Sequence, residues 1–218
     1  MDANFWHARW EANQIGFHQD EINAHLQRYW PQLDVPAGTE VFVPLCGKSR
    51  DVLWLAGRGH RVLGVEISPL AVEAFFVENT LPVSVAALGG FVRHQAGEIV
   101  LLQGDYFDLR AADLAEVRGV YDRASLIALP PALRARYAAQ MARLVSPGTP
   151  VLLITLEYAQ AEMKGPPFAV AAAEVQALFA SDFHIDTLGA LDILAENPRF
   201  QARGLSRLQE QVYRLRRR

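Results

Sequence analysis

Residues 40–68 decide the fold, and they read Glu40-Val-Phe-Val-Pro-Leu-Cys-Gly-Lys-Ser-Arg-Asp-Val-Leu-Trp-Leu-Ala-Gly-Arg-Gly-His-Arg-Val-Leu-Gly-Val-Glu66-Ile-Ser68. An apolar strand at 40–45 leads through a tight loop into a helix at 49–58. A second strand follows at 61–66 and ends on the acidic Glu66. A carboxylate about twenty residues after the loop is placed to accept hydrogen bonds from a ribose diol. The stretch therefore predicts a βαβ unit that binds an adenosine-containing cofactor.

The loop of this unit does not match a phosphate-binding loop. Gly47-Lys48-Ser49 imitates the end of such a motif, but the motif needs a glycine five positions earlier, where the chain has Phe42. Proline, leucine and cysteine at 44–46 place side chains where a dinucleotide needs a close glycine approach. S-adenosylmethionine, an adenosine ligand without phosphates, fits this loop better. An ordinary strand-to-helix turn is the alternative interpretation.

Composition predicts one folded domain over residues 1–218, with a helical cap at 1–35 and an α/β core at 36–218. Hydrophobic residues make up 51% of the 218, which argues against disorder. The formal charge of −3 argues against a general nucleic-acid binder, and the basic Arg214-Leu-Arg-Arg-Arg218 is typical of a solvated chain end. We expect a monomer.

Cysteine count, the N-terminal residues and the spacing of histidines bear on the cellular compartment and on metal binding. A single cysteine, Cys46, excludes an internal disulfide and a multi-cysteine metal site. The first residues show no basic region followed by an apolar core, and no apolar run reaches 18 residues, so we expect neither a signal peptide nor a membrane span. The histidines show no metal-ligand spacing with carboxylates or cysteine. We expect a cytoplasmic protein that contacts no membrane and needs no metal.

Hydrophobic periodicity and turn residues predict an alternation of helices and strands around the central unit. The predicted helices cover 3–10, 20–30, 49–58, 68–78, 131–145 and 170–180. The predicted strands cover 40–45, 61–66, two segments of 91–103 around Gly97, 120–122, 150–157, 183–188 and 207–215. Such an alternation favours a doubly wound, mostly parallel sheet. The last strand should run antiparallel, because no helix-length pattern precedes it.

Four pieces of the chain together resemble the bacterial form of the thiopurine S-methyltransferase family. They are Phe5-Trp6-His-Ala-Arg-Trp10 with Gly16-Phe17-His18; Val43-Pro-Leu-Cys-Gly-Lys-Ser49 with Val65-Glu66; Gly104-Asp105-Tyr106-Phe107-Asp108-Leu109; and Tyr121-Asp122-Arg123-Ala124-Ser125-Leu126. The resemblance covers nearly the whole chain. It implies a class I methyltransferase fold with a seven-stranded sheet, and an N-terminal helical lid is expected over it.

The resemblance also implies S-adenosylmethionine as methyl donor and the sulfur of thiopurines or related aromatic and heterocyclic thiols as acceptor. Bacterial relatives are also associated with methylation of selenium and tellurium species. Carried onto this sequence, the cofactor-binding residues would be Trp10, Leu45, Glu66, Asp105, Tyr106 and Arg123. Phe17 would border the acceptor. Arg123 and Arg199 would act in catalysis, although Glu196-Asn-Pro-Arg-Phe200 matches the family only loosely.

Each candidate residue also has a structural interpretation. Glu66 would otherwise cap a helix or pair with a cation, and Asp105 would otherwise be a turn residue. Arg123 follows a strand at the carboxyl edge of the sheet, where ligands gather, but it could instead pair with an aspartate. Trp6 and Trp10 lie one helical turn apart, a spacing more typical of a core than of a cofactor lid.

Two other functions remain open at this level. A nicotinamide-dependent oxidoreductase would use a similar fold, but the loop chemistry disfavours it. A non-catalytic nucleotide sensor would keep the fold without turnover, and the presence of Glu66, Asp105 and Arg123 argues against it. In-line methyl transfer to a thiolate needs alignment and exclusion of water rather than a strong base.

Overall fold

The structure is a computed structural model and describes residues 3–218. Internal contacts divide the chain into two compact units, with the boundary between Tyr121 and Asp122. The first unit carries the βαβ stretch and the second carries the C-terminal strands. The prediction of a single domain with a helical cap over residues 1–35 stays a prediction.

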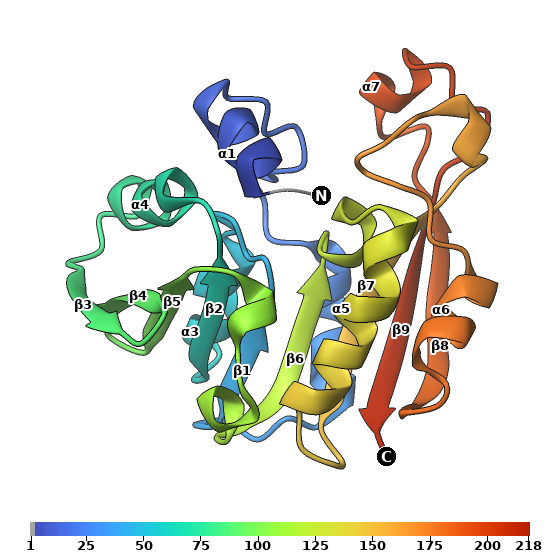
Figure 1. The fold of residues 1–218 in the computed structure, drawn as a ribbon. Helices are drawn as coiled ribbons and strands as arrows, with labels where there is room; N and C mark the ends of the chain where they lie inside the picture. The colour runs from blue at the N-terminus through green and yellow to red at the C-terminus, as the bar shows by residue number, and fades with distance from the viewer. Residues whose placement is uncertain (1–2) are drawn as a thin grey trace. The chain divides into compact units, whose positions relative to one another are not determined.

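The sheet of the first unit combines parallel strands with an antiparallel hairpin (Figure 1). Its strand order is β3-β4-β5-β2-β1-β6. β1 pairs in parallel with β2 and with β6, and β2 pairs in parallel with β5, whereas β3, β4 and β5 run antiparallel to one another. The strands are β1 (Glu40–Val43), β2 (Arg61–Glu66), β3 (Ser84–Leu88), β4 (Phe91–Ala96), β5 (Ile99–Gln103) and β6 (Val117–Arg123).

Two helices of the first unit, α2 and α4, begin where the sequence supplies a capping side chain. The Asn23 side chain accepts hydrogen bonds from two backbone N–H groups of α2, and the Ser68 hydroxyl accepts one from Ala71 in α4. α3 packs against β2, and α4 packs against β2 and β5. The helical elements are α1 (Ala3–Glu11), α2 (Ala24–Tyr29), η1 (Trp30–Leu33), α3 (Asp51–Gly57), α4 (Pro69–Glu78), η2 (Tyr106–Asp108) and η3 (Ala111–Leu114).

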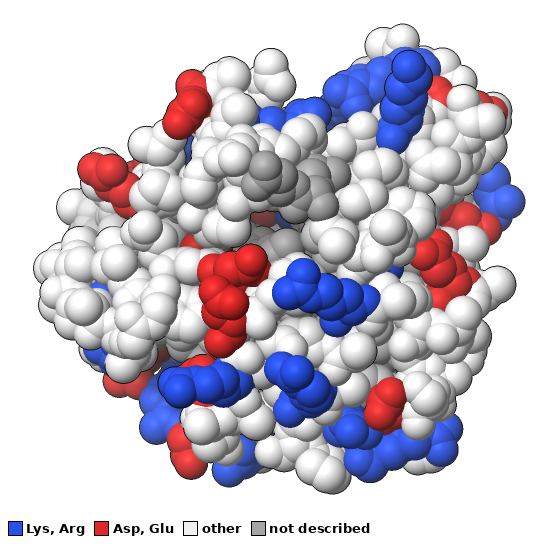
Figure 2. Space-filling view, in the orientation of Figure 1, with Lys and Arg blue, Asp and Glu red and all other residues white. Residues whose placement is uncertain are grey.

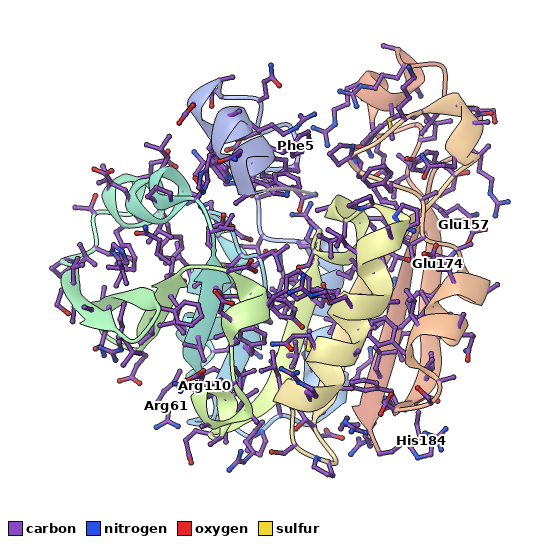
Figure 3. The ribbon with its side chains drawn as sticks, in the orientation of Figure 1. Phe5, Arg61, Arg110, Glu157, Glu174 and His184 are labelled. Carbon is purple, nitrogen blue, oxygen red and sulfur yellow. The ribbon has the colours of Figure 1, made fainter. Side chains whose placement is uncertain are left out.

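The second unit is an antiparallel three-stranded arrangement with helices. β9 (Gln209–Arg217) lies between β7 (Pro150–Glu157) and β8 (Phe183–Asp192) and runs antiparallel to both. The prediction of an antiparallel final strand is confirmed. The helical elements are η4 (Leu126–Ala128), α5 (Pro131–Leu144), η5 (Gln160–Glu162), α6 (Ala172–Phe179) and α7 (Pro198–Gln201). α6 packs against α5, and the buried Arg134 of α5 pairs with Glu174 of α6 (labelled in Figure 3) at 2.7 Å.

The strands described in residues 3–218 number nine, where the sequence pattern predicted eight and the family resemblance implied a seven-stranded sheet. β3 was not predicted, because all five of its residues are exposed and no hydrophobic alternation marks it. β6 and β8 are both longer than predicted. The α/β class and the parallel centre of the first unit agree with the prediction. No helix among the described residues is long and apolar enough to cross a membrane.

Candidate active site

The loop after β1 has an unusual backbone. β1 ends at Val43, and Leu45 and Gly47 then adopt positive φ angles of 45° and 53°. A leucine in this left-handed region is uncommon and costs conformational energy. The backbone N–H of Cys46 donates to the carbonyl of Val65 at 3.0 Å, which fixes the loop beside the end of β2. The loop therefore lies at the carboxyl ends of two parallel strands, where ligands of open α/β sheets bind.

Glu66 is buried at the end of β2 and holds this loop. Its carboxylate accepts a hydrogen bond from the N–H of Gly47 at 2.9 Å and another from the N–H of Ser68 at 2.8 Å. Burial raises the pKa of Glu66, while the N–H groups of Ser68, Gly47 and Ile67 act in the opposite direction. A carboxylate has about four acceptor sites, so Glu66 keeps capacity for a further donor such as a ribose hydroxyl.

The N-terminal helix contacts the same loop. A Cβ atom on Gly47 would lie 3.3 Å from Cζ2 of Trp10, so the indole packs directly over this glycine. Trp10 and Trp6 both meet the ring of Phe17 edge-on, with centroids 5.6 and 5.8 Å apart. The ring Nε2 of His7 donates a hydrogen bond to the backbone carbonyl of Ile67 at 3.1 Å. The structure thus brings Trp10 to the loop that contains Leu45, with Phe17 packed against Trp10.

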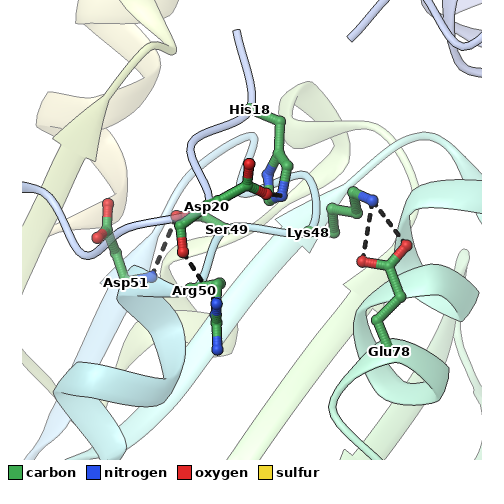
Figure 4. Close-up of polar contacts among 7 residues, drawn as sticks. All are labelled: His18, Asp20, Lys48, Ser49, Arg50, Asp51 and Glu78. Atoms are coloured by element: carbon green, nitrogen blue, oxygen red, sulfur yellow. Dashed lines mark hydrogen bonds and ion pairs between the residues drawn. The ribbon is translucent and has the colours of Figure 1, made fainter. Parts of the chain in front are cut away.

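Asp51 and Lys48 organise the loop, and sequence analysis missed both. The Asp51 carboxylate accepts from the N–H of Asn23 and from the hydroxyl of Tyr121, each at 2.8 Å. Lys48 binds both carboxylate oxygens of Glu78 on α4, at 2.6 and 2.9 Å (Figure 4). These partners lie 28 to 70 residues away in the chain, so no local pattern marks them. Lys48 is engaged in an ion pair, which agrees with the argument against a phosphate-binding loop.

Asp105 lies beside Glu66 at the next strand end. The N–H of Gly104 donates to the backbone carbonyl of Glu66 at 2.9 Å. The exposed Asp105 side chain accepts from the N–H of Phe107 at 2.8 Å, so the turn role weighed from sequence is present. The ring of Tyr106 is only 4% exposed and stacks on Phe42 with centroids 6.4 Å apart. Its aromatic face is therefore part of the core.

Cys46 has the surroundings of a packing residue. It is buried, and a Cβ atom on Gly64 would lie 2.8 Å from its sulfur. Burial raises the pKa of the thiol well above its ordinary value, and the nearby charge of Glu66 raises it further. A thiol in this environment is a poor nucleophile. No group of three or more histidine, cysteine or acidic residues in the described chain could hold a metal ion.

The two arginines predicted for catalysis lie in the second unit. Arg123 ends β6 and is partly exposed, and Ala124 after it has a positive φ of 63°. Arg199 is on α7, with its guanidinium 4.8 Å from the centroid of the Phe200 ring. Burial lowers the pKa of Arg199, and the positive charges of Arg203 and Arg123 lower it further. Arg199 is nevertheless among the exposed residues of the chain.

The neighbour of Arg123 is a buried acid. Asp122 accepts a hydrogen bond from the hydroxyl of Tyr137 at 2.7 Å, and Ser125 and the N–H of Leu126 also donate to it. Burial raises its pKa to about 6 despite these donors. Asp122 thereby connects the end of β6 to α5 and to the turn that follows Arg123.

Comparison with known proteins identifies the family. The model of the family described as Thiopurine S-methyltransferase (TPMT) matches residues 1–218. The chain belongs to the thiopurine S-methyltransferase family. It is an S-adenosylmethionine-dependent methyltransferase, and the interpretation as a nicotinamide-dependent oxidoreductase is excluded.

Curated relatives of this family cover the chain almost completely. The thiopurine S-methyltransferase of Nitrosospira multiformis is 53% identical over 99% of this chain and 98% of its own. That of Pseudomonas fluorescens is 51% identical over 99% of each chain, and that of Methylococcus capsulatus is 51% identical over 99% and 98%. Enzymes of this name therefore share the whole length of the chain, including both units.

Solved structures of lower identity share the fold. A SAM-dependent methyltransferase from Anabaena variabilis has a TM-score of 0.69 at 15% identity, covering 99% of this chain and 95% of its own. The 1,6-didemethyltoxoflavin-N1-methyltransferase of Burkholderia thailandensis, solved with S-adenosylhomocysteine, has a TM-score of 0.61 at 16% identity, covering 97% and 86%. The class I methyltransferase fold expected from the sequence is thus confirmed.

Proposed function

We propose that this methyltransferase transfers the methyl group of S-adenosylmethionine to the sulfur of thiopurines or of related aromatic and heterocyclic thiols. The observation that carries the proposal is the arginine group of the second unit: the guanidinium groups of Arg199 and Arg203 lie 4.8 and 5.9 Å from the centroid of the Phe200 ring, and Arg123 ends β6 in the same unit. Fixed positive charge lowers the pKa of a thiol acceptor and favours the thiolate, which is the reactive form. The names of the relatives support the same acceptor class.

Donor binding is proposed for the first unit. Glu66 would accept a ribose hydroxyl while it holds the N–H of Gly47. Trp10, Leu45 and Asp105 would border the same ligand, and Phe17 would lie toward the acceptor. The ring of Tyr106 is buried in the core, and from there it would support the residues that border the ligand.

The reaction would be an in-line displacement. The thiolate sulfur forms a bond to the methyl carbon as the bond from that carbon to the sulfonium breaks, and the electron pair stays on the departing thioether. The residues contribute alignment, charge and exclusion of water. Arg123 and Arg199 would hold the acceptor as its anion, and no base is required for an acceptor that ionises near neutral pH.

A methyl-transfer screen tests the acceptor class. Donor labelled in its methyl group is incubated with thiopurines, aromatic thiols, selenols and tellurite, and labelled product is quantified. We expect the highest kcat/KM with aromatic or heterocyclic thiols. If only selenium or tellurium species accept the label, the second candidate, a role in metalloid methylation, replaces this one, because the same arginines would bind an inorganic anion.

A series of substitutions at Arg123 tests the role of its charge. Arg123→Lys keeps the charge without the planar fork, and Arg123→Met removes both. We expect activity to fall from wild type to Lys to Met, most steeply with thiols that ionise poorly, and the melting temperature to change little. A Met variant with undiminished activity on every thiol, or one that unfolds, would show that Arg123 is structural.

A further inference from the structure

The N-terminal segment, residues 3–22, is fastened at its end to the first residues of α3. The Nη1 of Arg50 donates a hydrogen bond to the backbone carbonyl of Asp20 at 2.9 Å, and the Asp51 carboxylate accepts one from the N–H of Asn23 at 2.8 Å. Figure 4 shows Arg50 and Asp51 beside Asp20 at the start of this helix. These two consecutive residues, the anchor pair, therefore hold the point at which the N-terminal segment ends.

Asp51 is buried, and both of its carboxylate oxygens are used. The residue is 2% exposed, and its second oxygen accepts from the hydroxyl of Tyr121 on β6 at 2.8 Å. A buried carboxylate costs free energy unless its oxygens are hydrogen-bonded, so its charge holds both donors in place. The Asn23 side chain also caps α2, so its backbone cannot shift without loss of that cap. Asp51 thus joins the end of the N-terminal segment to α3 and β6 at one buried point.

Trp10 is the part of this segment that meets the proposed donor site. Its indole packs over Gly47, whose N–H donates to Glu66. α1, which carries Trp10, has no fully buried residue, and its only Arg, Lys, Asp or Glu residues are Arg9 and Glu11. Where Figure 1 draws α1, Figure 2 shows mainly uncharged surface. The helix therefore has little burial and few charges of its own to fix its place on the loop.

A tethered group meets its partner more often when the tether is short and fixed. Residues 11–22 join Trp10 to the anchored Asn23, and bringing the ends of such a loop together costs conformational entropy. The effective concentration of a tethered group falls when its attachment is loosened. Release of residues 20–23 from the anchor pair would lengthen the free chain, so Trp10 would cover Gly47 for a smaller fraction of the time.

We propose that Arg50 and Asp51 are positioning residues for the methyl donor, which hold the N-terminal segment where Trp10 covers the loop at Gly47. The inference rests on the proposed function in one respect, the placement of the donor beside Glu66 and Trp10. Neither residue of the anchor pair touches the donor in this arrangement. Loss of the anchor pair therefore weakens donor binding through Trp10, and it raises the KM for the donor more than it lowers kcat at saturating donor.

Calorimetric titration with S-adenosylmethionine, in the absence of an acceptor, tests the anchor pair. Arg50→Ala, at an exposed position, should raise the Kd about three- to tenfold through the lost hydrogen bond to the segment. Asp51→Ala should raise it on the order of tenfold or more. Asp51→Asn should stay within about threefold of wild type, because an amide can still accept from Asn23 and donate to the Tyr121 oxygen. The matched control is Arg58→Ala, an exposed arginine at the opposite end of α3, which should bind as wild type does.

A double-mutant cycle with Trp10→Ala separates positioning from direct contact with the donor and from a general loss of stability. In the Trp10→Ala background, Arg50→Ala should change the Kd by less than about twofold, because the group through which it acts is absent. Equal losses in both backgrounds, or a wild-type Kd in Arg50→Ala, would overturn the proposal. Arg50 is exposed, so this result stands even where Asp51→Ala unfolds. The proposed function itself fails in a different way, by the absence of methyl transfer to any thiol, which the donor titration does not measure.

Discussion

Glu66 is a buried carboxylate that does two tasks at once. It accepts hydrogen bonds from the N–H groups of Gly47 and Ser68, and its pKa is raised because burial outweighs these bonds. An additional donor to a buried carboxylate stabilises its charged form. A ligand hydroxyl would therefore gain a charge-assisted hydrogen bond here, and the loop around Gly47 would be fixed by the same group.

Replacement of Glu66 by glutamine tests this assignment. Glu66→Gln keeps the size and one acceptor oxygen but removes the charge, so we expect S-adenosylmethionine to bind more weakly by roughly 1–3 kcal/mol. Calorimetric titration measures the change. Glu73→Gln, at an exposed position of α4, is the matched control and should bind as wild type does. Unchanged donor affinity in Glu66→Gln would remove Glu66 from the cofactor site.

Three acidic residues, Glu66, Asp105 and Asp51, show how much of a residue's role can be predicted from the sequence around it. Glu66 was recognised because an acidic residue ending an apolar strand is conspicuous. Asp105 was selected on the same ground, and its contact with the N–H of Phe107 shows that a turn role accompanies any role in binding. Asp51 was not recognised, since an acid in the first turn of a helix is common and its partners Asn23 and Tyr121 are distant in the chain.

At the scale of elements, α1 is the segment whose role depends most on its contacts. It has no fully buried residue, and it touches α4 and, through Trp10, the loop at Gly47. Few buried apolar contacts make a segment prone to local opening. The edge-on cluster of Trp6, Trp10 and Phe17 joins α1 to the turn after it. An opening of this segment would uncover the loop, which is the property required of a lid.

Hydrogen exchange tests whether α1 and the following turn close over the loop. With S-adenosylhomocysteine and an acceptor bound, exchange over residues 5–20 should slow, because the bound ligands would hold Trp10 against Gly47. The β3–β4 hairpin, residues 84–96, serves as the internal control and should exchange at the same rate in both states. Equal protection of residues 5–20 with and without ligands would show a fixed helix in place of a lid.

The elements that sequence analysis missed have a common feature. β3 is an edge strand with five exposed residues, and α7 is a single turn of four residues. Neither buries a repeating apolar face, so hydrophobic periodicity cannot detect them. β2 and β7, whose side chains are almost all buried, were predicted with their correct bounds because each reads as a continuous apolar strand between turn residues.

At the scale of the whole molecule, buried acids make the free energy of unfolding depend on pH. Asp122 has an ordinary pKa near 3.8 and a pKa of about 6 in the folded chain. A pKa raised by folding contributes stability that is complete below about pH 4 and is lost as the pH rises through 6. The folded protein therefore bears a cost for the Asp122 charge at neutral pH.

Replacement of Asp122 by asparagine should remove this pH dependence. Asp122→Asn keeps an acceptor for the Tyr137 hydroxyl but cannot ionise. The free energy of unfolding of this variant, relative to that of wild type, should rise between pH 4 and pH 7 and then remain constant. The difference between the folded and unfolded pKa of Asp122 limits this rise to at most about 3 kcal/mol. Urea unfolding at a series of pH values measures this. Asp34→Asn, at an exposed position, should give a curve parallel to wild type, and a parallel curve for Asp122→Asn would contradict the prediction.

The sequence by itself determined the βαβ unit, the alternation of helices and strands, the acidic end of β2 and the membership of the family. These features are local, because capping residues, apolar runs and turn residues act over a few positions. The tertiary structure decided which groups meet: Trp10 over Gly47, Asp51 between Asn23 and Tyr121, and Arg203 beside Arg199 on one phenylalanine ring. Contacts of this kind depend on packing between distant segments, and the charge and burial that give such groups their chemistry exist only after the chain has folded.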